Sequence, residues 1–201
     1  MNIPSGSMTK NSVPHDLASS GNKGFTISPS NSISSKIAWV QNDFQPRFDK
    51  WVIEPIEILI NTQNALVGFI LMTCAIDYLA GFYWGESTRH KTKDAYIEFV
   101  NRYFPSSYDP KELYESLRNG LVHMFTIKDK KYSLTHDNSE RHLQVDKHGQ
   151  TVLNAQDFFN DLKAAKDQYF EDVANQQELL NKLIVRYERD GFLNSGDLFQ
   201  S

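Results

Sequence analysis

Apolar residues recur at steps of three and four along most of the chain after Lys36, which is the spacing of amphipathic helices. The stretches that have this pattern, or that are apolar enough for a buried helix, are residues 36–60, 65–84, 94–104, 110–124 and 154–190. Pro46 and Pro55 interrupt the first stretch, and each fits best in a first helical turn or at a break. The pattern therefore predicts an all-α protein, built as an antiparallel bundle of four to six helices.

Residues 131–153 follow a different pattern, in which apolar and polar residues alternate. A turn is expected at 147–150, so the pattern predicts a small β-hairpin or three-stranded meander inserted between helices. Residues 1–35 hold ten serines and show no helical or strand period, which predicts a disordered tail. The folded domain is then expected to span residues 36–190, with a flexible C-terminus at 191–201.

Residues 65–84 are the most apolar stretch and have the length of a membrane span. Asp77 lies within this stretch, and a carboxylate near the centre of a bilayer costs about 2.5 to 3.5 kcal/mol. The sequence shows no second span and no flanking cluster of basic residues. We therefore expect a buried helix of a cytoplasmic protein that does not enter the membrane, in which Asp77 must find a partner or shift its pKa.

Composition narrows the possible functions further. The single cysteine, Cys74, excludes an internal disulfide and a zinc finger with cysteine ligands, and it favours a reducing compartment such as the cytoplasm. The formal net charge of -4 excludes a general cationic field that would attract nucleic acid, so any phosphate must be bound by a local site. His136, His142 and His148 recur every six residues but fall on or between separate expected strands, so we expect no metal site.

The strongest candidate chemistry lies in residues 118–123, with the sequence RNGLVH. In a helix that turns about 100° per residue, one side faces the core. That side carries Leu113, Leu117, Leu121, Met124 and Phe125. Asn119 and His123 are neighbours at i, i+4 and point away from it, while Arg118 borders it and can swing its long side chain outward. Val122 lies between them on a side that the core does not cover, which suggests contact with a second subunit.

The same six residues resemble the R-x4-6-H signature of the HEPN (higher eukaryotes and prokaryotes nucleotide-binding) domains, including the Asn that often follows the Arg. The resemblance covers roughly residues 50–190 and implies a helical bundle that forms a homodimer with both motifs in one composite cleft. It implies cleavage of RNA without metal or cofactor, in which the ribose 2′-hydroxyl attacks the adjacent phosphorus. The products are a 2′,3′-cyclic phosphate and a free 5′-hydroxyl. It also implies a toxin or phage-defence setting.

Each residue of the motif suits such a reaction. His123 can exchange protons near neutral pH and act as general base or acid. Arg118 offers a planar fork of donors to phosphate oxygens as negative charge builds up in the transition state. Asn119 can orient His123 or bind a phosphate oxygen. By the same resemblance Asp77, an acidic residue on an earlier helix, is expected to hold Arg118 or His123 in place.

Other roles are open for the same side chains. Arg118 can form a salt bridge with Glu115, and Asp77 can pair with Arg102 or cap a backbone group. His123 and Asn119 can simply be solvated. The alternative function is a non-catalytic HEPN module that uses the same face to bind RNA, a nucleotide or a partner protein. Phe125 stands where a toxin branch that is modified by nucleotide transfer has Tyr, in R-x4-H-x-Y, so we do not expect that modification.

Overall fold

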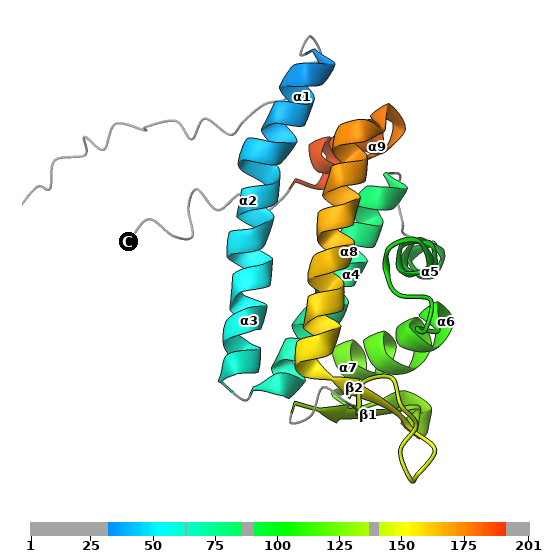
Figure 1. The fold of residues 1–201 in the computed structure, drawn as a ribbon. Helices are drawn as coiled ribbons and strands as arrows, with labels where there is room; N and C mark the ends of the chain where they lie inside the picture. The colour runs from blue at the N-terminus through cyan, green and yellow to red at the C-terminus, as the bar shows by residue number, and fades with distance from the viewer. Residues whose placement is uncertain (1–31, 63, 86–90, 137–140, 192–201) are drawn as a thin grey trace, which may run out of the picture. The chain divides into compact units, whose positions relative to one another are not determined.

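The computed structural model describes residues 32–62, 64–85, 91–136 and 141–191, and helices make up 77% of them (Figure 1). This confirms the all-α class. Most of the expected N-terminal tail and of the expected C-terminal segment lies outside the described residues. The first helix begins at Ile33, before the boundary expected at Lys36, because Ser32 caps it: the Ser32 side chain accepts a hydrogen bond from the backbone N–H of Ser35.

Residues 33–61 form one continuous helical run that passes through both prolines. Its segments are α1 (Ile33–Trp39), η1 (Val40–Phe44), α2 (Gln45–Phe48), η2 (Asp49–Ile53) and α3 (Glu54–Asn61). The π-helical turns η1 and η2 each precede a short α-helix whose first turn holds Pro46 or Pro55. A proline ring presses on the carbonyl four residues back, and the wider π turn gives it room. The expected interruption of the stretch therefore does not occur: each proline lies in the first turn of a short α-helical segment inside one continuous helix.

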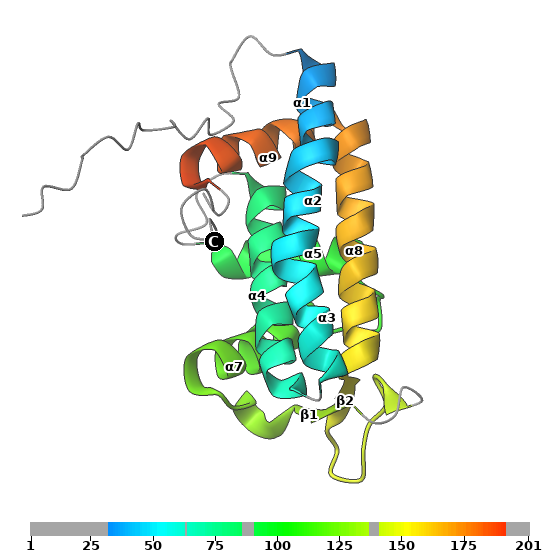
Figure 2. The ribbon, with the colours of Figure 1, turned by 90° about the vertical axis from the view of Figure 1, so that its left-hand side faces the viewer.

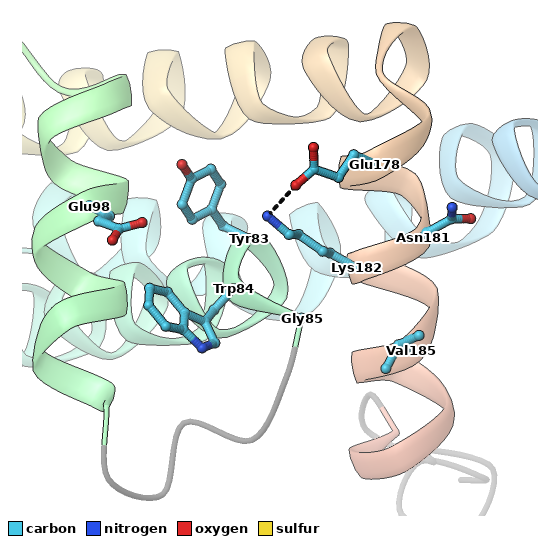
Figure 3. Close-up of a pocket in the computed structure, with 8 residues that line it drawn as sticks. All are labelled: Tyr83, Trp84, Gly85, Glu98, Glu178, Asn181, Lys182 and Val185. Atoms are coloured by element: carbon cyan, nitrogen blue, oxygen red, sulfur yellow. Dashed lines mark ion pairs between the residues drawn. The ribbon is translucent and has the colours of Figure 1, made fainter.

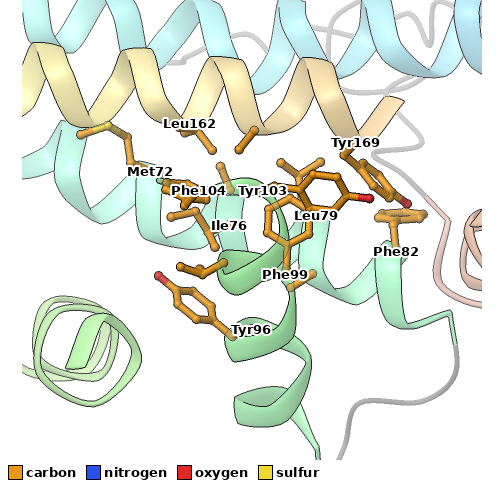
Figure 4. Packing of buried hydrophobic residues seen from close by; sticks show 14 of the residues in the cluster. Met72, Ile76, Leu79, Phe82, Tyr96, Phe99, Tyr103, Phe104, Leu162 and Tyr169 are labelled. Atoms are coloured by element: carbon orange, nitrogen blue, oxygen red, sulfur yellow. The ribbon is translucent and has the colours of Figure 1, made fainter. Parts of the chain in front are cut away.

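The central helix of the described residues is α4 (Ala65–Trp84). It packs against α3, α5 (Thr92–Tyr103), α8 (Ala155–Asn175) and α9 (Gln177–Asp190). Figure 4 shows part of the resulting core, where Ile76 of α4, Phe99 of α5 and Leu162 of α8 belong to one cluster of buried residues. Of the described helices, α4 alone is long and apolar enough to cross a membrane by length and composition, and 56% of its apolar window is buried in the fold.

The long helices fall into two groups by direction. The run from α1 to α3 lies beside α4 and α8 and runs opposite to both, while α5 and α9 cross them (Figures 1 and 2). The helical packing thus has two parts. One is the run from α1 to α3 side by side with α4 and α8, and the other is the crossing helices α5 and α9.

The single helix expected over residues 154–190 is wrong, because the chain leaves the helical conformation at Gln176, where φ is -123° and ψ is 108°. The start is as expected: the Asn154 side chain accepts two backbone hydrogen bonds in the first turn of α8. Near the other end, the Asn175 side chain donates to the carbonyl of Glu171 at 2.9 Å, and such competition for backbone groups disfavours continued helix. The helix after the break, α9, crosses the end of α8 (Figure 2).

The motif lies on the helical stretch 110–124. Its segments are α6 (Pro110–Glu112), the π-helical turn η3 (Leu113–Arg118) and α7 (Asn119–Met124). As the Asp-Pro pair predicts, the Asp109 side chain accepts hydrogen bonds from two backbone N–H groups of the first turn. This stretch packs against α4 and α5, which brings the motif next to the central helix.

The hairpin or meander expected over residues 131–153 is wrong in its topology. The segments here are a 3₁₀ turn η4 (Lys128–Lys130), β1 (Tyr132–Thr135) and β2 (Thr151–Asn154). The two strands pair in parallel, and the expected middle strand supplies one isolated antiparallel bridge, between Val145 and Thr151. Leu143 has a left-handed backbone (φ 60°), which interrupts a strand there. The long connection between β1 and β2 lets the chain return in the same direction.

Candidate functional site

The motif residues meet where η3 joins α7, beside α4. Arg118 is the last residue of η3, and its side chain lies against α4, where the expectation was an outward swing. Its Nε and Nη2 lie 2.6 and 2.5 Å from Oδ2 of Asp77. The structure thus pairs Asp77 with one of its two expected partners, and only 16% of the Arg118 side chain is exposed. We call Asp77, Arg118, Asn119 and His123 together the motif face.

The third guanidinium nitrogen, Nη1, is directed at the other two motif residues. Nη1 of Arg118 donates to Oδ1 of Asn119 at 3.0 Å and lies 3.1 Å from Nε2 of His123. A guanidinium can only donate, so Nε2 can only accept in this contact. His123 is exposed. The motif face therefore presents an imidazole at the surface, in contact with an arginine.

The Asp77 carboxylate is poorly solvated for a charged group. Its side chain is 17% exposed, and Oδ1 is buried with no hydrogen-bond partner among the described residues. Burial raises the pKa of the Asp77 carboxyl above its ordinary value of 3.8, although the charge and hydrogen bond of Arg118 act in the opposite direction. Burial also raises the pKa of the Cys74 thiol, which precedes Asp77 by one turn of α4. A carboxyl with a perturbed pKa beside a specific charged partner is a common mark of functional sites.

Tyr114, which the sequence analysis did not single out, supports Arg118. The guanidinium carbon of Arg118 lies 5.4 Å from the centre of the Tyr114 ring, which is within cation–π distance. Tyr114 in turn packs edge-on against Tyr96 of α5, with ring centres 5.3 Å apart. The signal in the sequence was the i, i+4 spacing between Tyr114 and Arg118, which places both on one side of a helix.

Gly120, in the middle of the motif, lets the chain fold back directly after α7. The backbone N–H of Thr126 donates to the carbonyl of Gly120 at 3.2 Å. A Cβ atom at position 120 would lie 2.3 Å from the carbonyl oxygen of Thr126, so a larger residue does not fit. The same turn removes Met124 and Phe125 from the core side of the helix. The expected burial of these two residues is therefore wrong, and they are 55% and 74% exposed.

Each alternative ion-pair partner of Arg118 and Asp77 pairs with a different residue. Glu115, the alternative partner of Arg118, pairs with Lys93. Arg102, the alternative partner of Asp77, pairs with Asp172 at 2.8 Å. Neither residue is therefore part of the motif face.

His142 makes structural contacts in the insert. Its Nδ1 accepts a hydrogen bond from the backbone N–H of Asn154 at 3.1 Å, and its Nε2 lies 2.8 Å from the hydroxyl of Tyr108. These contacts attach the segment before β2 to the end of β2 and to the connection between α5 and α6. Across the described ranges, no group of three or more His, Cys, Asp or Glu side chains is arranged to hold a metal ion.

A pocket of about 550 Å³ lies away from the motif, at the C-terminal end of α4 (Figure 3). The rings of Tyr83 and Trp84 line it, with Glu98 on the α5 side and Glu178 and Lys182 on the α9 side. Lys182 pairs with Glu178 at 2.8 Å and also lies 5.8 Å from the centre of the Tyr83 ring. Because this lysine is engaged within the pocket and two carboxylates accompany it, the pocket is poorly suited to a phosphate.

The motif face combines two chemical capacities. The imidazole of His123 can accept or donate a proton at the surface. The Nη1 group of Arg118 points to the same place and can bind an anion that displaces its present acceptors. A scan against protein-family models, a search of curated proteins and a search of solved structures each find no match for this chain.

Proposed function

We propose that this chain is a HEPN-like, metal-independent endoribonuclease of the cytoplasm, which cleaves RNA through attack of a ribose 2′-hydroxyl on the adjacent phosphorus. The observation that carries the proposal is the contact of Arg118 Nη1 with both Asn119 and His123 at the surface. One group that stabilises negative charge and one that transfers protons are thereby placed around the same point. A toxin or phage-defence setting belongs to the same proposal, through the family resemblance.

The reaction begins when a phosphate oxygen of RNA replaces Asn119 and His123 as the acceptor for Arg118 Nη1. This exchange releases the lone pair on Nε2 of His123, which then takes the proton of the 2′-hydroxyl. The 2′-oxygen forms a bond to phosphorus, and the bond from phosphorus to the 5′-oxygen breaks. Arg118 stabilises the charge that develops on the phosphate oxygens. The leaving 5′-oxygen needs a proton from a second acid.

A second copy of the chain supplies that acid in the proposed homodimer. His123 of the partner subunit, in its protonated form, donates to the 5′-oxygen across a twofold axis. Exposed apolar residues support such a contact: Met124 follows His123 directly, and Leu66 and Val67 are exposed in the first turn of α4, a helix that packs against α7. Val122 is half-buried within its own chain and has surface left for a partner.

The test is incubation of the purified protein with single-stranded RNA and transfer RNA in EDTA. We expect cleavage with 2′,3′-cyclic phosphate and 5′-hydroxyl ends, and a loss of about 10²- to 10⁴-fold in rate for His123→Ala. The matched control is His148→Ala, since His148 is also exposed but lies in the insert. Undiminished cleavage by His123→Ala with an unchanged melting curve would remove the site assignment.

The dimer has its own test, through Val122→Glu. A buried charge at the proposed subunit contact should convert the dimer to a monomer in light scattering and should abolish cleavage. Val185→Glu is the control, because Val185 is an exposed valine on α9. A wild-type chain that remains a single chain at high concentration, yet cleaves RNA, would contradict the two-copy mechanism.

The second candidate function is a non-catalytic HEPN-like module that binds RNA, a nucleotide or a partner protein through the motif face. The burial of Arg118 against Asp77 favours it, because a neutralised and 16% exposed guanidinium attracts phosphate less strongly. For this function we expect no cleavage of a broad panel of RNAs, together with binding that Arg118→Glu abolishes. Cleavage by the wild-type protein that His123→Ala removes would decide against it.

A further inference from the structure

Phe125 has an unusual backbone and an unusual position for a large apolar residue. It caps the C-terminus of α7 in the left-handed conformation, with φ 52° and ψ 33°, which glycine commonly adopts at such a site and bulky residues rarely do. Its side chain is 74% exposed, more than any other large hydrophobic residue in the described ranges. A strained backbone of this kind costs stability, and residues that have one cluster at functional sites.

The chain after Phe125 carries three lysines and one aspartate, Lys128, Asp129, Lys130 and Lys131, and Lys131 pairs with Glu112. Lys128 and Lys130 lie in η4 and are exposed. Asp129 and Lys130 also have left-handed backbones, with φ of 58° and 51°. The turn that follows the motif thus presents an aromatic ring and two lysines on a backbone that local preferences alone would not select.

The position of Phe125 relative to the motif face fits a nucleotide. Only Met124 separates Phe125 from His123, so their Cα atoms lie at most about 7 Å apart. In RNA, one sugar separates a phosphate from its base. A base next to a phosphate bound at Arg118 and His123 is therefore within reach of the segment that carries Phe125.

We infer that Phe125 is a specificity-determining residue that stacks on a nucleobase next to the scissile phosphate of single-stranded RNA, with Lys128 and Lys130 contacting the flanking backbone. The inference rests on the proposed function and names its substrate class. An exposed aromatic ring among basic residues is the usual combination for single-stranded nucleic acid, since every base has a face that stacks. A base inside a duplex has no accessible face, so paired RNA is a poor ligand.

The charged residues also argue for RNA over a second copy as the occupant of Phe125. The buried centres of protein interfaces are depleted of charge, and lysine is depleted there especially. Phe125 leads directly into a segment with Lys128, Asp129, Lys130 and Lys131. The apolar exposed residues Leu66 and Val67 lie instead on α4 and remain with the proposed dimer contact.

The test is the affinity of the full chain for a fluorescent single-stranded RNA with 2′-O-methyl riboses, which cannot undergo 2′-hydroxyl attack. Phe125→Gly should weaken binding about 5- to 150-fold, the range for loss of one stacked base. It should also raise the melting temperature, because glycine relieves the left-handed backbone. Phe125→Trp should retain binding, and Phe125→Leu should lose it although leucine is apolar. Val145→Ala, at an exposed apolar residue of the insert, is the control and should bind as wild type does.

The outcomes separate this inference from the proposed function. If the wild-type chain cleaves RNA and Phe125→Gly binds and cleaves it equally well, the stacking role is wrong and the nuclease proposal stands. If Phe125→Gly changes the oligomeric state in light scattering while RNA affinity per chain is unchanged, Phe125 is a protein contact and the inference is overturned. If the wild-type chain neither binds nor cleaves single-stranded RNA, both proposals fail together.

Discussion

Among the described residues, two arginine–aspartate pairs join segments that are distant in sequence, and they differ in how well the carboxylate is satisfied. In the pair Arg102–Asp172, the two side chains are 42% and 20% exposed, and Tyr103 also donates to Asp172 at 3.1 Å. Partial burial acts to raise the pKa of Asp172, but the hydrogen bonds from Arg102 and Tyr103 outweigh it, and the pKa is lowered. In the pair Arg118–Asp77, burial prevails and the pKa of Asp77 is raised.

The difference indicates which pair is structural. Asp172 is ionised more easily in the fold than in water, so its pair with Arg102 holds α5 to α8 at little cost. Asp77 has shorter contacts to its arginine, yet Oδ1 is buried without a hydrogen bond from the described residues. A pair that the fold retains despite its unfavourable burial is more readily explained by function than by stability.

The strongest test of this comparison replaces both members of each pair. We expect Asp77→Leu with Arg118→Met to lower RNA cleavage by at least about 10²- to 10³-fold, because the donor to the phosphate is lost. Its free energy of unfolding should stay the same or rise by about 1 to 4 kcal/mol, as for other buried pairs replaced by apolar residues. Cleavage assays and urea unfolding measure the two effects.

The matched double variant, Asp172→Leu with Arg102→Met, should show the opposite result. We expect normal cleavage and a loss of stability of up to about 1 kcal/mol, because this pair is partly exposed. If the Asp77 and Arg118 double variant unfolds much more easily than this control, the motif pair is structural and the comparison fails.

A second test changes the backbone at Gly120, in the middle of the motif. Gly120→Ala should destabilise the fold by about 1 to 3 kcal/mol and lower cleavage, since the added methyl group meets the Thr126 carbonyl. Gly149→Ala is the control: its Cβ meets nothing within 4 Å, and only its positive φ of 76° adds a cost, about 1 to 2 kcal/mol. Normal cleavage in Gly120→Ala would show that the turn after α7 does not position the motif.

Acidification should change the stability contributions of Asp77 and Asp172 in opposite directions. Because the folded pKa of Asp77 is raised, its contribution to stability is present below its unfolded pKa and is lost as the pH rises through the folded pKa. The folded pKa of Asp172 is lowered, so its contribution is present above its unfolded pKa and is lost as the pH falls through the folded pKa. As the pH falls through the folded pKa of Asp77, the stability advantage of wild type over Asp77→Asn should grow. Its advantage over Asp172→Asn should shrink only as the pH falls below the ordinary value of 3.8. Urea unfolding along the pH series checks both, and the same sign for both carboxylates would contradict the pKa directions.

The smallest effect is expected at the surface pair of Lys93 and Glu115. Lys93→Ala removes the partner of Glu115, which the sequence analysis offered as an alternative partner for Arg118. Because the pair is exposed, the melting temperature and the cleavage rate should both remain within experimental error of wild type. A clear loss of cleavage would mean that Glu115 does influence Arg118, and that the motif face extends beyond its four residues.

Much of the local structure followed from the sequence, because caps and helical periods depend on neighbouring residues. An Asp before a proline and an Asn before a helical period both predict N-caps, and the Asp109 and Asn154 side chains make these backbone hydrogen bonds. The break at Gln176 and the left-handed residue Phe125 were not predicted. The helix breaks at Gln176 although the apolar pattern of the sequence continues past this residue. Phe125 is exposed at a position that the helical period assigns to the core.

The sequence by itself determined that the protein is helical, that Arg118, Asn119 and His123 lie close together, and that Asp77 needs a partner. Those conclusions follow from spacing along the chain and from the cost of burying a charge. Only the tertiary structure decided that Arg118 turns inward to Asp77 and that the strands pair in parallel. Side-chain partners distant in sequence and the path of a long connection depend on how whole elements pack, which no local pattern contains.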